Sequence, residues 1–316
     1  MQTVRRQIVR QRPVTGESRR LFHGRGQCFA GYDDLVIDYF APVVVVMLYR
    51  RRAEDWLQEL CRVLAEELPG QRAIYLQERF LPGAPGRLLA GTLPATVDAH
   101  EAGLRYRLRL GDAQNIGFFP DMAVGRRVIR DRAAGKKVLN LFAYTCSFSV
   151  AALSGGAVRV VNLDMNRGAL ELGRLNHQLN DLDLRKVGFL PQELFRSFGK
   201  LRKLGPFDLI ICDPPATQGK SFTAERHWPK LLRKLPELLA PGGEVFACLN
   251  APHLPPAFLD EQFAGAGFAR NGSFTPGAGF PEAVPEKGVF MGLYRPADQL
   301  QNKGVEPAGS TPQQNP

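Results

Sequence analysis

The sequence predicts an α/β fold, in which a mostly parallel, doubly wound sheet carries helices on both faces. Two observations support this prediction. From Lys136 onward, strand-like apolar runs alternate with helix-like stretches, which is the pattern of repeated βα units. The six residues Phe207–Cys212 have the profile of a strand buried on both faces, as in a parallel sheet.

The first part of the chain is organised differently. From about residue 30 to residue 112, short alternating runs are interrupted by Gly and Pro, and an amphipathic helix is predicted at Ala53–Glu67. The polar end of the chain is rich in Pro and Gln. We therefore predict a basic arm over residues 1–14, a small α+β domain that binds substrate or RNA over 15–125, the sheet domain over 126–295, and a disordered tail over 296–316.

The net charge of +10 favours a polyanionic partner. Residues 1–30 contain seven arginines and one acid, Glu17. Such a segment can neutralise the phosphates of a nucleic acid, or it can be a solvated basic tail. Charge alone leaves both interpretations open.

Composition also argues against several classes of protein. No apolar run reaches the roughly 18 residues of a membrane span, and the start of the chain lacks the apolar core of a signal peptide. The five cysteines include no CxxC pair, as in reduced cytosolic proteins, and the five histidines show no metal-ligand spacing. We expect a cytoplasmic monomer or homodimer, with no metal and no membrane partner.

The strongest candidate for an active site is Asp213, which directly follows the strand at Phe207–Cys212 and precedes Pro214 and Pro215. The two prolines can continue neither a strand ladder nor a helix. Ligands of open α/β sheets bind beyond the carboxyl ends of the strands. A carboxylate held at this edge by a stiff turn is therefore expected to take part in the chemistry.

Two further stretches indicate a nucleotide-like cofactor. The predicted strand at Lys137–Phe142 runs into Asn140–Thr145, and the next helix is predicted to begin at Ser147, where free N–H groups could meet a polar ligand. Asp164 ends the second strand, where such folds bind ribose hydroxyls. The alternative for Asp164 is an N-cap for the following helix.

The type of cofactor follows from what these stretches lack. There is no G-x-G-x-x-G pattern, which counts against NAD and FAD. Gly219-Lys220-Ser221 lacks the upstream glycine of a phosphate-binding P-loop. S-adenosylmethionine is the remaining common cofactor for an acid in this place.

The stretches around Asn140–Ser147, Asp164 and Asp213 resemble those of a known family. The segments Gln114–Arg126 and Phe29–Phe40 add to this resemblance. The sequence is similar to the class I methyltransferases that modify large-subunit ribosomal RNA, both the cytosine-C5 branch and its guanine-N7 relatives. The similarity covers roughly residues 15–295 and implies a Rossmann-like sheet that binds S-adenosylmethionine. The PUA domain that often precedes this pair of domains is not found in the sequence.

The resemblance implies roles by position. Cofactor-binding residues would be Asn140, Phe142, Ala143, Tyr144, Thr145, Ser147, Asp164, Met165 and Glu193. Asp121 and Arg126 would close over the cofactor, with Phe119 stacking or packing nearby. Asp213, Pro214 and Pro215 would face the target base. The sequence departs from the family at Cys146 and Ser147, where glycines are usual, and at Gln192-Glu193, where an Asp pair is usual.

Cys248 ends a predicted strand beside the one that delivers Asp213. Cytosine-C5 enzymes of the family have a catalytic cysteine at this strand end. Its thiolate adds to C6 of the ring and thereby activates C5. A buried, inert cysteine is the equally weighted alternative. Near the same edge, Lys220, Phe222 and Asn250 are candidates for binding the substrate.

We therefore predict a methyltransferase that uses S-adenosylmethionine to modify a base of RNA, with ribosomal RNA as the expected partner. Cytosine C5 is slightly favoured, with Cys248 as nucleophile and Asp213 orienting the base. The alternatives are a guanine nitrogen methylated without a covalent intermediate, a small molecule or protein as acceptor, and an RNA-binding protein that keeps the fold without the activity.

Overall fold

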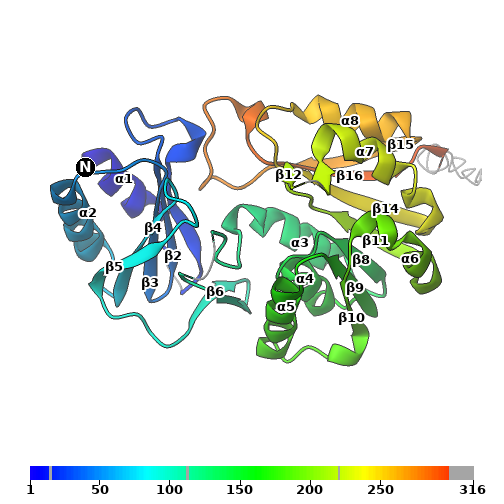
Figure 1. Ribbon diagram of the computed structural model, residues 1–316, viewed down its shortest axis with the longest axis horizontal. Coiled ribbons are helices and arrows are strands. Elements are labelled where there is room, and N and C mark those ends of the chain that lie inside the picture. The colour runs from blue at the N-terminus through cyan, green and yellow to red at the C-terminus, as the bar shows by residue number, and fades with distance from the viewer. Residues whose placement is uncertain (14–15, 112–113, 220, 299–316) are drawn as a thin grey trace, which may run out of the picture.

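The computed structural model describes residues 1–316 except 14–15, 112–113, 220 and 299–316. Two sheets lie side by side, a smaller one in the first third of the chain and a larger one after it (Figure 1). No helix in the described ranges is long and apolar enough to cross a membrane.

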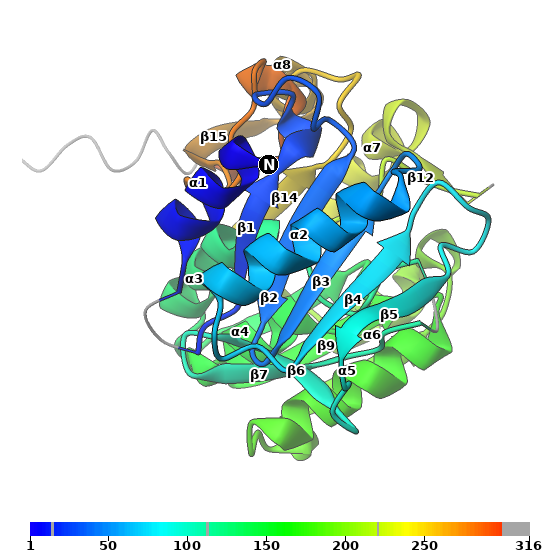
Figure 2. The same ribbon diagram turned by 90° about the vertical axis from the view of Figure 1, so that its left-hand side faces the viewer.

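The small sheet has five strands in sequential order. They are β1 (Arg19–His23), β2 (Leu35–Phe40), β3 (Val43–Leu48), β4 (Ala73–Glu78) and β5 (Gly86–Gly91). Helices α1 (Gln2–Gln11) and α2 (Glu54–Glu67) cover one face (Figure 2). Side chains alternate along the strands, so that Ile37 and Val46 pack under these helices while Val36 and Met47 point to the opposite face.

The basic start of the chain has more structure than its charge indicates. Val4 and Ile8 are fully buried against the small domain. Arg5 forms ion pairs with Glu66 and Glu67 of α2, both at 2.5 Å. At least this arginine stabilises the protein itself and is not available to bind phosphate.

A hairpin of β6 (Val97–Glu101) and β7 (Leu104–Leu108) follows the small sheet and connects it to the larger one. The large sheet has the strand order β10-β9-β8-β11-β14-β16-β15. Its strands are β8 (Lys137–Leu141), β9 (Arg159–Asp164), β10 (Val187–Pro191), β11 (Phe207–Cys212), β14 (Leu239–Leu249), β15 (Phe268–Phe274) and β16 (Phe290–Pro296). The first five strands in this order are parallel. The reversed strand is β16, which pairs antiparallel with β14 on one side and with β15 on the other.

Helices cover both faces of the large sheet, as the alternating pattern predicted. One face packs against α3 (Ala123–Arg132), α4 (Ser147–Ser154) and α5 (Arg167–Leu179). The other packs against α6 (Phe198–Leu204), α7 (Ala224–Leu232) and α8 (Pro256–Gly265). A two-stranded ribbon of β12 (Thr217–Gln218) and β13 (Phe222–Thr223) precedes α7. The expected fold class is confirmed.

The order of strands positions the site. The chain builds outward from β8 to β9 and β10 on one side, and to β11 and β14 on the other. The direction of winding therefore reverses between β8 and β11, which is where open α/β sheets bind their ligands. Asp164, Asp213 and Asn250 all lie at the same carboxyl edge, because they end or directly follow parallel strands.

Candidate functional site

A narrow pocket, here called the cofactor pocket, lies where β8 and β9 end at the carboxyl edge of the large sheet. Its wall combines aromatic and aliphatic side chains with two carboxylates. The lining residues are Phe142, Leu163, Asp164, Met165, Glu193, Leu194, Phe195, Ser221 and Phe222. This composition suits a ligand that has a flat apolar part and hydroxyl groups.

Asp164 is held firmly in this pocket. Its two carboxylate oxygens accept hydrogen bonds from the backbone N–H groups of Tyr144 and Asn166, each at 2.8 Å. Burial raises the pKa of Asp164, and these N–H groups oppose the rise. The N-cap of α5 is Asn166, whose side chain accepts a bond from the N–H of Ala169. The alternative in which Asp164 caps this helix is therefore wrong.

The loop between β8 and α4 follows an unusual backbone path. Phe142, Tyr144 and Cys146 have φ values of 58°, 46° and 62°, in the region that glycine adopts with least strain. The Cys146 side chain fits because α5 places Gly173 against it, and a Cβ at position 173 would collide with the Cys146 sulfur. Cys146 thus adopts a backbone conformation that glycine favours.

The side chains of Tyr144 and Thr145 hold this loop in place. Thr145 Oγ1 donates a hydrogen bond to the carbonyl of Gly117 at 2.7 Å, and Tyr144 Oη donates to the carbonyl of Asn115 at 3.0 Å. The N–H of Ala143 donates to the carbonyl of Leu163, and Ser147 is the first residue of α4. The loop is therefore fixed to β9 and to the segment that precedes α3.

The Asn140 side chain does not reach the cofactor pocket. Its Nδ2 donates a hydrogen bond to Asn162 Oδ1 at 2.9 Å, and Asn162 in turn donates to the hydroxyl of Ser149, which bonds to His177. This buried network lies between the sheet and helices α4 and α5. Asn140 therefore supports the pocket from behind.

Glu193 and Met165 lie at the rim of the cofactor pocket. The carboxylate of Glu193 accepts hydrogen bonds from the N–H groups of Phe195 and Arg196, both at 2.9 Å, so it also shapes the turn after β10. Met165 exposes 47% of its surface. A bound ligand with a flat ring would cover this apolar side chain.

On the other side of β8, Asp213 lies beside the thiol of Cys248. Desolvation raises the pKa of Asp213 to about 7, the nearby Asp121 carboxylate adds to the rise, and a hydrogen bond with Cys248 opposes it. Burial and the Asp213 carboxylate raise the pKa of the Cys248 thiol well above its ordinary value. The thiol is therefore protonated at rest, next to a carboxyl group that titrates near neutral pH.

The turn after Asp213 places one proline inside the protein and one outside, since Pro214 is buried and Pro215 is exposed.

Among the described residues, no cluster of His, Cys, Asp or Glu could hold a metal ion.

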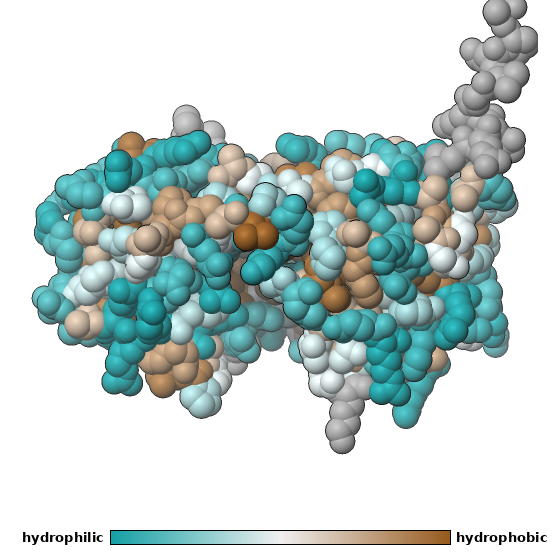
Figure 3. All heavy atoms as spheres, turned by 90° about the horizontal axis from the view of Figure 1, so that it is seen from above, coloured by the Kyte–Doolittle hydropathy of each residue, from teal (hydrophilic) through white to brown (hydrophobic). Residues whose placement is uncertain are grey.

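Asp121 belongs to the wall of a broad cleft between the two sheets, here called the acceptor cleft. Other lining residues are Arg25, Tyr49, Arg79, Asn250 and Lys287. The guanidinium carbons of Arg25 and Arg79 lie 4.4 Å and 5.5 Å from the centre of the Tyr49 ring. Figure 3 shows the surface hollowed between the two halves of the molecule.

Two residues expected to close over the cofactor lie elsewhere. Asp121 is in the acceptor cleft, close enough to Asp213 to raise its pKa. Arg126 is buried, and its Nε and Nη2 donate to the carboxylate of Glu101 at 2.6 and 2.7 Å. Arg126 thus joins α3 to the β6–β7 hairpin. Neither residue lines the cofactor pocket.

Two of the three predicted phenylalanines, Phe119 and Phe222, each lie at the site that was expected for the other. Phe119, expected near the cofactor, is 40% exposed and lines the acceptor cleft, 5.6 Å from the Tyr144 ring. Phe222, expected to bind the substrate, is buried in the cofactor pocket with its ring 5.0 Å from that of Phe142. Asn250 lines the acceptor cleft, and Lys220 lies outside the described residues.

Sequence reasoning missed Tyr49 and Arg79. Each stands one residue beyond the end of a buried strand, β3 or β4, and these two strands are parallel neighbours. The signal used for Asp164 and Asp213 was a functional side chain at the carboxyl end of a parallel strand. The same signal, applied to the small domain, would have found this pair.

Comparisons with known proteins agree with this arrangement. A family model of S-adenosylmethionine-dependent methyltransferases matches residues 19–294. Ribosomal RNA large subunit methyltransferase I from Serratia proteamaculans is 32% identical over 231 residues, and that from Yersinia pseudotuberculosis is 31% identical over the same length. These matches cover 69% of this chain and 58% of each relative, so the chain spans little more than half the length of the curated relatives it matches.

Solved structures show the same fold. A protein assigned as a methyltransferase, in complex with SAH, aligns with a TM-score of 0.80 and 25% identity over 88% of this chain and 75% of its own. A protein from Streptococcus mutans, assigned as a SAM-dependent methyltransferase, aligns with a TM-score of 0.81 and 23% identity over 93% of this chain and 81% of its own.

Proposed function

The chain belongs to the S-adenosylmethionine-dependent methyltransferase family, and from this premise we propose that it transfers a methyl group to a base of RNA. We further propose that the substrate is ribosomal RNA and the target atom is cytosine C5. One observation carries the proposal: Asp213 and the Cys248 thiol meet at the strand ends, beside an arginine-lined cleft. All five cysteines are free thiols, which suits a reaction in the cytoplasm.

The cofactor pocket has the groups that S-adenosylmethionine requires. Asp164 has both oxygens fixed by backbone N–H groups, and each retains a lone pair for a ribose hydroxyl. Phe142, Met165 and Phe222 give the apolar surface that an adenine ring needs. When bound, the cofactor supplies an electrophilic methyl group.

The acceptor cleft suits a nucleic acid for electrostatic and geometric reasons. Arg25 and Lys287 add positive charge to its wall, which favours phosphates. The Arg25–Tyr49–Arg79 stack presents flat cationic and aromatic surfaces, and unpaired RNA bases stack on such surfaces.

Asp213 and Cys248 can perform the chemistry of cytosine C5 together. The ring carbon is a weak nucleophile until a thiolate adds to C6. The carboxylate of Asp213 accepts the thiol proton as the sulfur bonds to C6, and its pKa of about 7 suits this transfer at neutral pH. Once C5 has taken the methyl group, a base removes the C5 proton and the C6–sulfur bond breaks. The proton held by Asp213 then returns to the sulfur and restores the thiol.

A nitrogen of the base is the second candidate target. Cys248 is 0% exposed and its thiol pKa is raised, so the resting sulfur is not an activated thiolate. In that case Asp213 would accept a hydrogen bond from an amino group of the base. Catalysis would then depend on holding the nitrogen and the methyl group in line.

The experiment uses tritiated S-adenosylmethionine with ribosomal RNA from a strain that lacks this protein. We expect the wild type to label the RNA and Cys248→Ala to lose the label. Cys212→Ala is the matched control, because Cys212 is equally buried at the end of the neighbouring strand. Label that survives in Cys248→Ala would identify a nitrogen target. No label from wild-type protein that binds the cofactor would contradict RNA methylation.

A further inference from the structure

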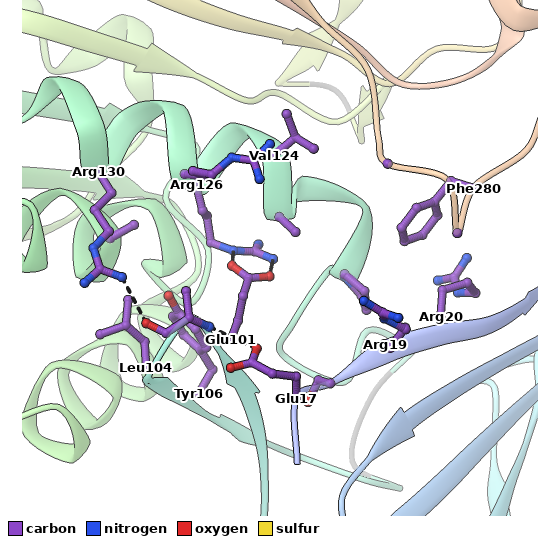
Figure 4. A pocket seen from close by; sticks show the side chains of 18 of the residues that line it. Glu17, Arg19, Arg20, Glu101, Leu104, Tyr106, Val124, Arg126, Arg130 and Phe280 are labelled. Carbon is purple, nitrogen blue, oxygen red and sulfur yellow. Dashed lines mark hydrogen bonds and ion pairs between the residues drawn. The ribbon is translucent and has the colours of Figure 1, made fainter. Parts of the chain in front are cut away.

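A second cavity, of about 770 Å³, lies next to the acceptor cleft and has no role in the reaction proposed above. Figure 4 shows it between α3, which contributes Arg126 and Arg130, and the start of β1, which contributes Arg19 and Arg20. The hairpin β6–β7 and the loop at residues 277–280 complete the wall. Here we call it the arginine cavity.

Hydrogen bonds fix the walls of the arginine cavity. Ser18 pairs with His100 through two bonds, from the N–H of Ser18 to the His100 carbonyl at 2.7 Å and from the N–H of His100 to Ser18 Oγ at 2.8 Å. Glu17 accepts the N–H of Ala102 at 3.0 Å. The segment before β1 is thereby joined to the hairpin. The cavity is a preformed feature of the fold, which lowers the cost of binding a ligand.

The acids of the wall are largely engaged by the protein itself. Both oxygens of Glu101 accept hydrogen bonds from Arg126, and Glu17 accepts the bond just described. Asp131, the remaining acid of the lining, is exposed at the end of α3. Arg126 therefore offsets the charge of Glu101, whereas Glu17 and Asp131 keep theirs.

On the wall of the arginine cavity, in contrast, the side-chain hydrogen-bond donors outnumber the acceptors. Within the described part of the chain, Arg19 and Arg127 have no carboxylate partner in ion-pair distance, and Arg130 donates to the carbonyl of Ala102. The buried Tyr106 hydroxyl and Arg126 Nη1 also lack a hydrogen-bond partner there. A wall with surplus cationic donors suits a ligand that carries only acceptors.

We propose that the arginine cavity binds a phosphodiester of the RNA strand that flanks the modified nucleotide. This inference rests on the proposed function. Arg20 and Pro120 line both the arginine cavity and the acceptor cleft, so a strand whose base enters the cleft can continue into the cavity. Guanidinium groups match phosphate oxygens in geometry and charge. Arg19 and Arg127, both exposed, are the side chains that would contact the phosphate first.

The test measures binding of a labelled single-stranded RNA, cut from the methylated region of the wild-type substrate, over a series of salt concentrations. Arg19→Gln/Arg127→Gln is the test variant. Arg6→Gln/Arg10→Gln is the matched control, because it removes the same charge from exposed positions of α1. We expect the test variant to bind RNA about tenfold more weakly, with a salt slope smaller by roughly 0.7 for each lost contact, and the control to match the wild type.

Three further results would decide for or against a phosphate subsite in the arginine cavity. Equal weakening in both variants would mean that the charge acts without a specific site. Competition of inorganic phosphate with RNA in the wild type, but not in Arg19→Gln/Arg127→Gln, would support a phosphate subsite. If phosphate instead bound there and RNA binding were unaffected, the cavity would be a site for a free anion.

Failure of this inference differs from failure of the proposed function. If the wild type labels RNA while the test variant binds RNA normally, the arginine cavity is not used by the substrate. If the wild type neither labels nor binds RNA, the RNA substrate itself is wrong. Cofactor affinity, expected to be unchanged in both variants, verifies that each of them is folded.

Discussion

The cofactor pocket and the acceptor cleft are neighbours, but the chain builds them in opposite ways. The pocket is formed by residues that end or follow β8, β9 and β10 in turn, completed by Ser221 and Phe222. The cleft gathers residues from β1 to the loop that precedes β16, that is, from Arg20 to Val289. A site made of consecutive strand ends can be found from a motif, whereas a site made between two sheets depends on how those sheets pack.

The cofactor pocket and the acceptor cleft are expected to govern two different properties of the enzyme, its affinity for the cofactor and its rate of methyl transfer. Changes in the cofactor pocket are expected to alter the affinity for S-adenosylmethionine. Changes in the acceptor cleft, and at Asp213 beside it, are expected to alter methyl transfer while that affinity stays the same.

The largest effect is expected from Asp213→Asn. The amide keeps the size of the side chain but cannot accept the thiol proton, so methyl transfer should fall by roughly 100-fold or more. Single-turnover assays with saturating cofactor and RNA measure this loss. Cofactor affinity should remain within about twofold. A variant that transfers methyl groups at the wild-type rate would remove Asp213 from the chemistry.

The pH dependence gives the next test. Desolvation and Asp121 raise the pKa of Asp213 to about 7, so the carboxylate that accepts a proton forms only as the pH rises through this value. The rate of transfer should therefore increase from pH 6 to pH 8 and then level off. In Asp213→Asn this increase should disappear. A wild-type rate that falls over the same range would indicate that the protonated carboxyl group is the active form.

A smaller effect is expected from Gly173→Ala. The added Cβ would collide with the Cys146 sulfur, and overpacking of this kind costs about 1–3 kcal/mol of stability. Because the same loop holds Tyr144 against Asp164, cofactor affinity should fall as well. Thermal unfolding and calorimetry measure the two effects.

The double variant Gly173→Ala/Cys146→Gly provides the control for this prediction. Glycine adopts the positive φ of residue 146 without strain and removes the colliding sulfur. We expect it to regain most of the lost stability. If the double variant is less stable than Gly173→Ala alone, the contact with Cys146 is not the cause.

The fold was predictable where the hydrophobic pattern is strong. The alternation after Lys136 and the apolar profile of β11 led to the parallel sheet and its helices. The edge strand β15 was missed because its burial is low along most of its length, so that it has little apolar signal. Helix α1 and strand β1 were missed because their arginines obscured the buried Val4, Ile8 and Leu21.

The site was predictable where residues follow strand ends. Asp164 and Asp213 lie at the carboxyl edge as the pattern indicated. Asp121 and Arg126 were assigned to the cofactor by the family resemblance alone. Their actual places depend on Glu101 and on the small sheet, which lie in other elements. Contacts between domains leave no local signal in a single sequence.

The most direct test of this account is calorimetric titration of S-adenosylmethionine into the wild type, Asp164→Ala and Asp213→Asn. We expect one site in the wild type, roughly 10- to 100-fold weaker binding in Asp164→Ala, because the ribose loses its fixed acceptor, and unchanged binding in Asp213→Asn. Wild-type affinity in Asp164→Ala, or loss of binding in Asp213→Asn, would contradict the separation of a cofactor pocket from an acceptor cleft.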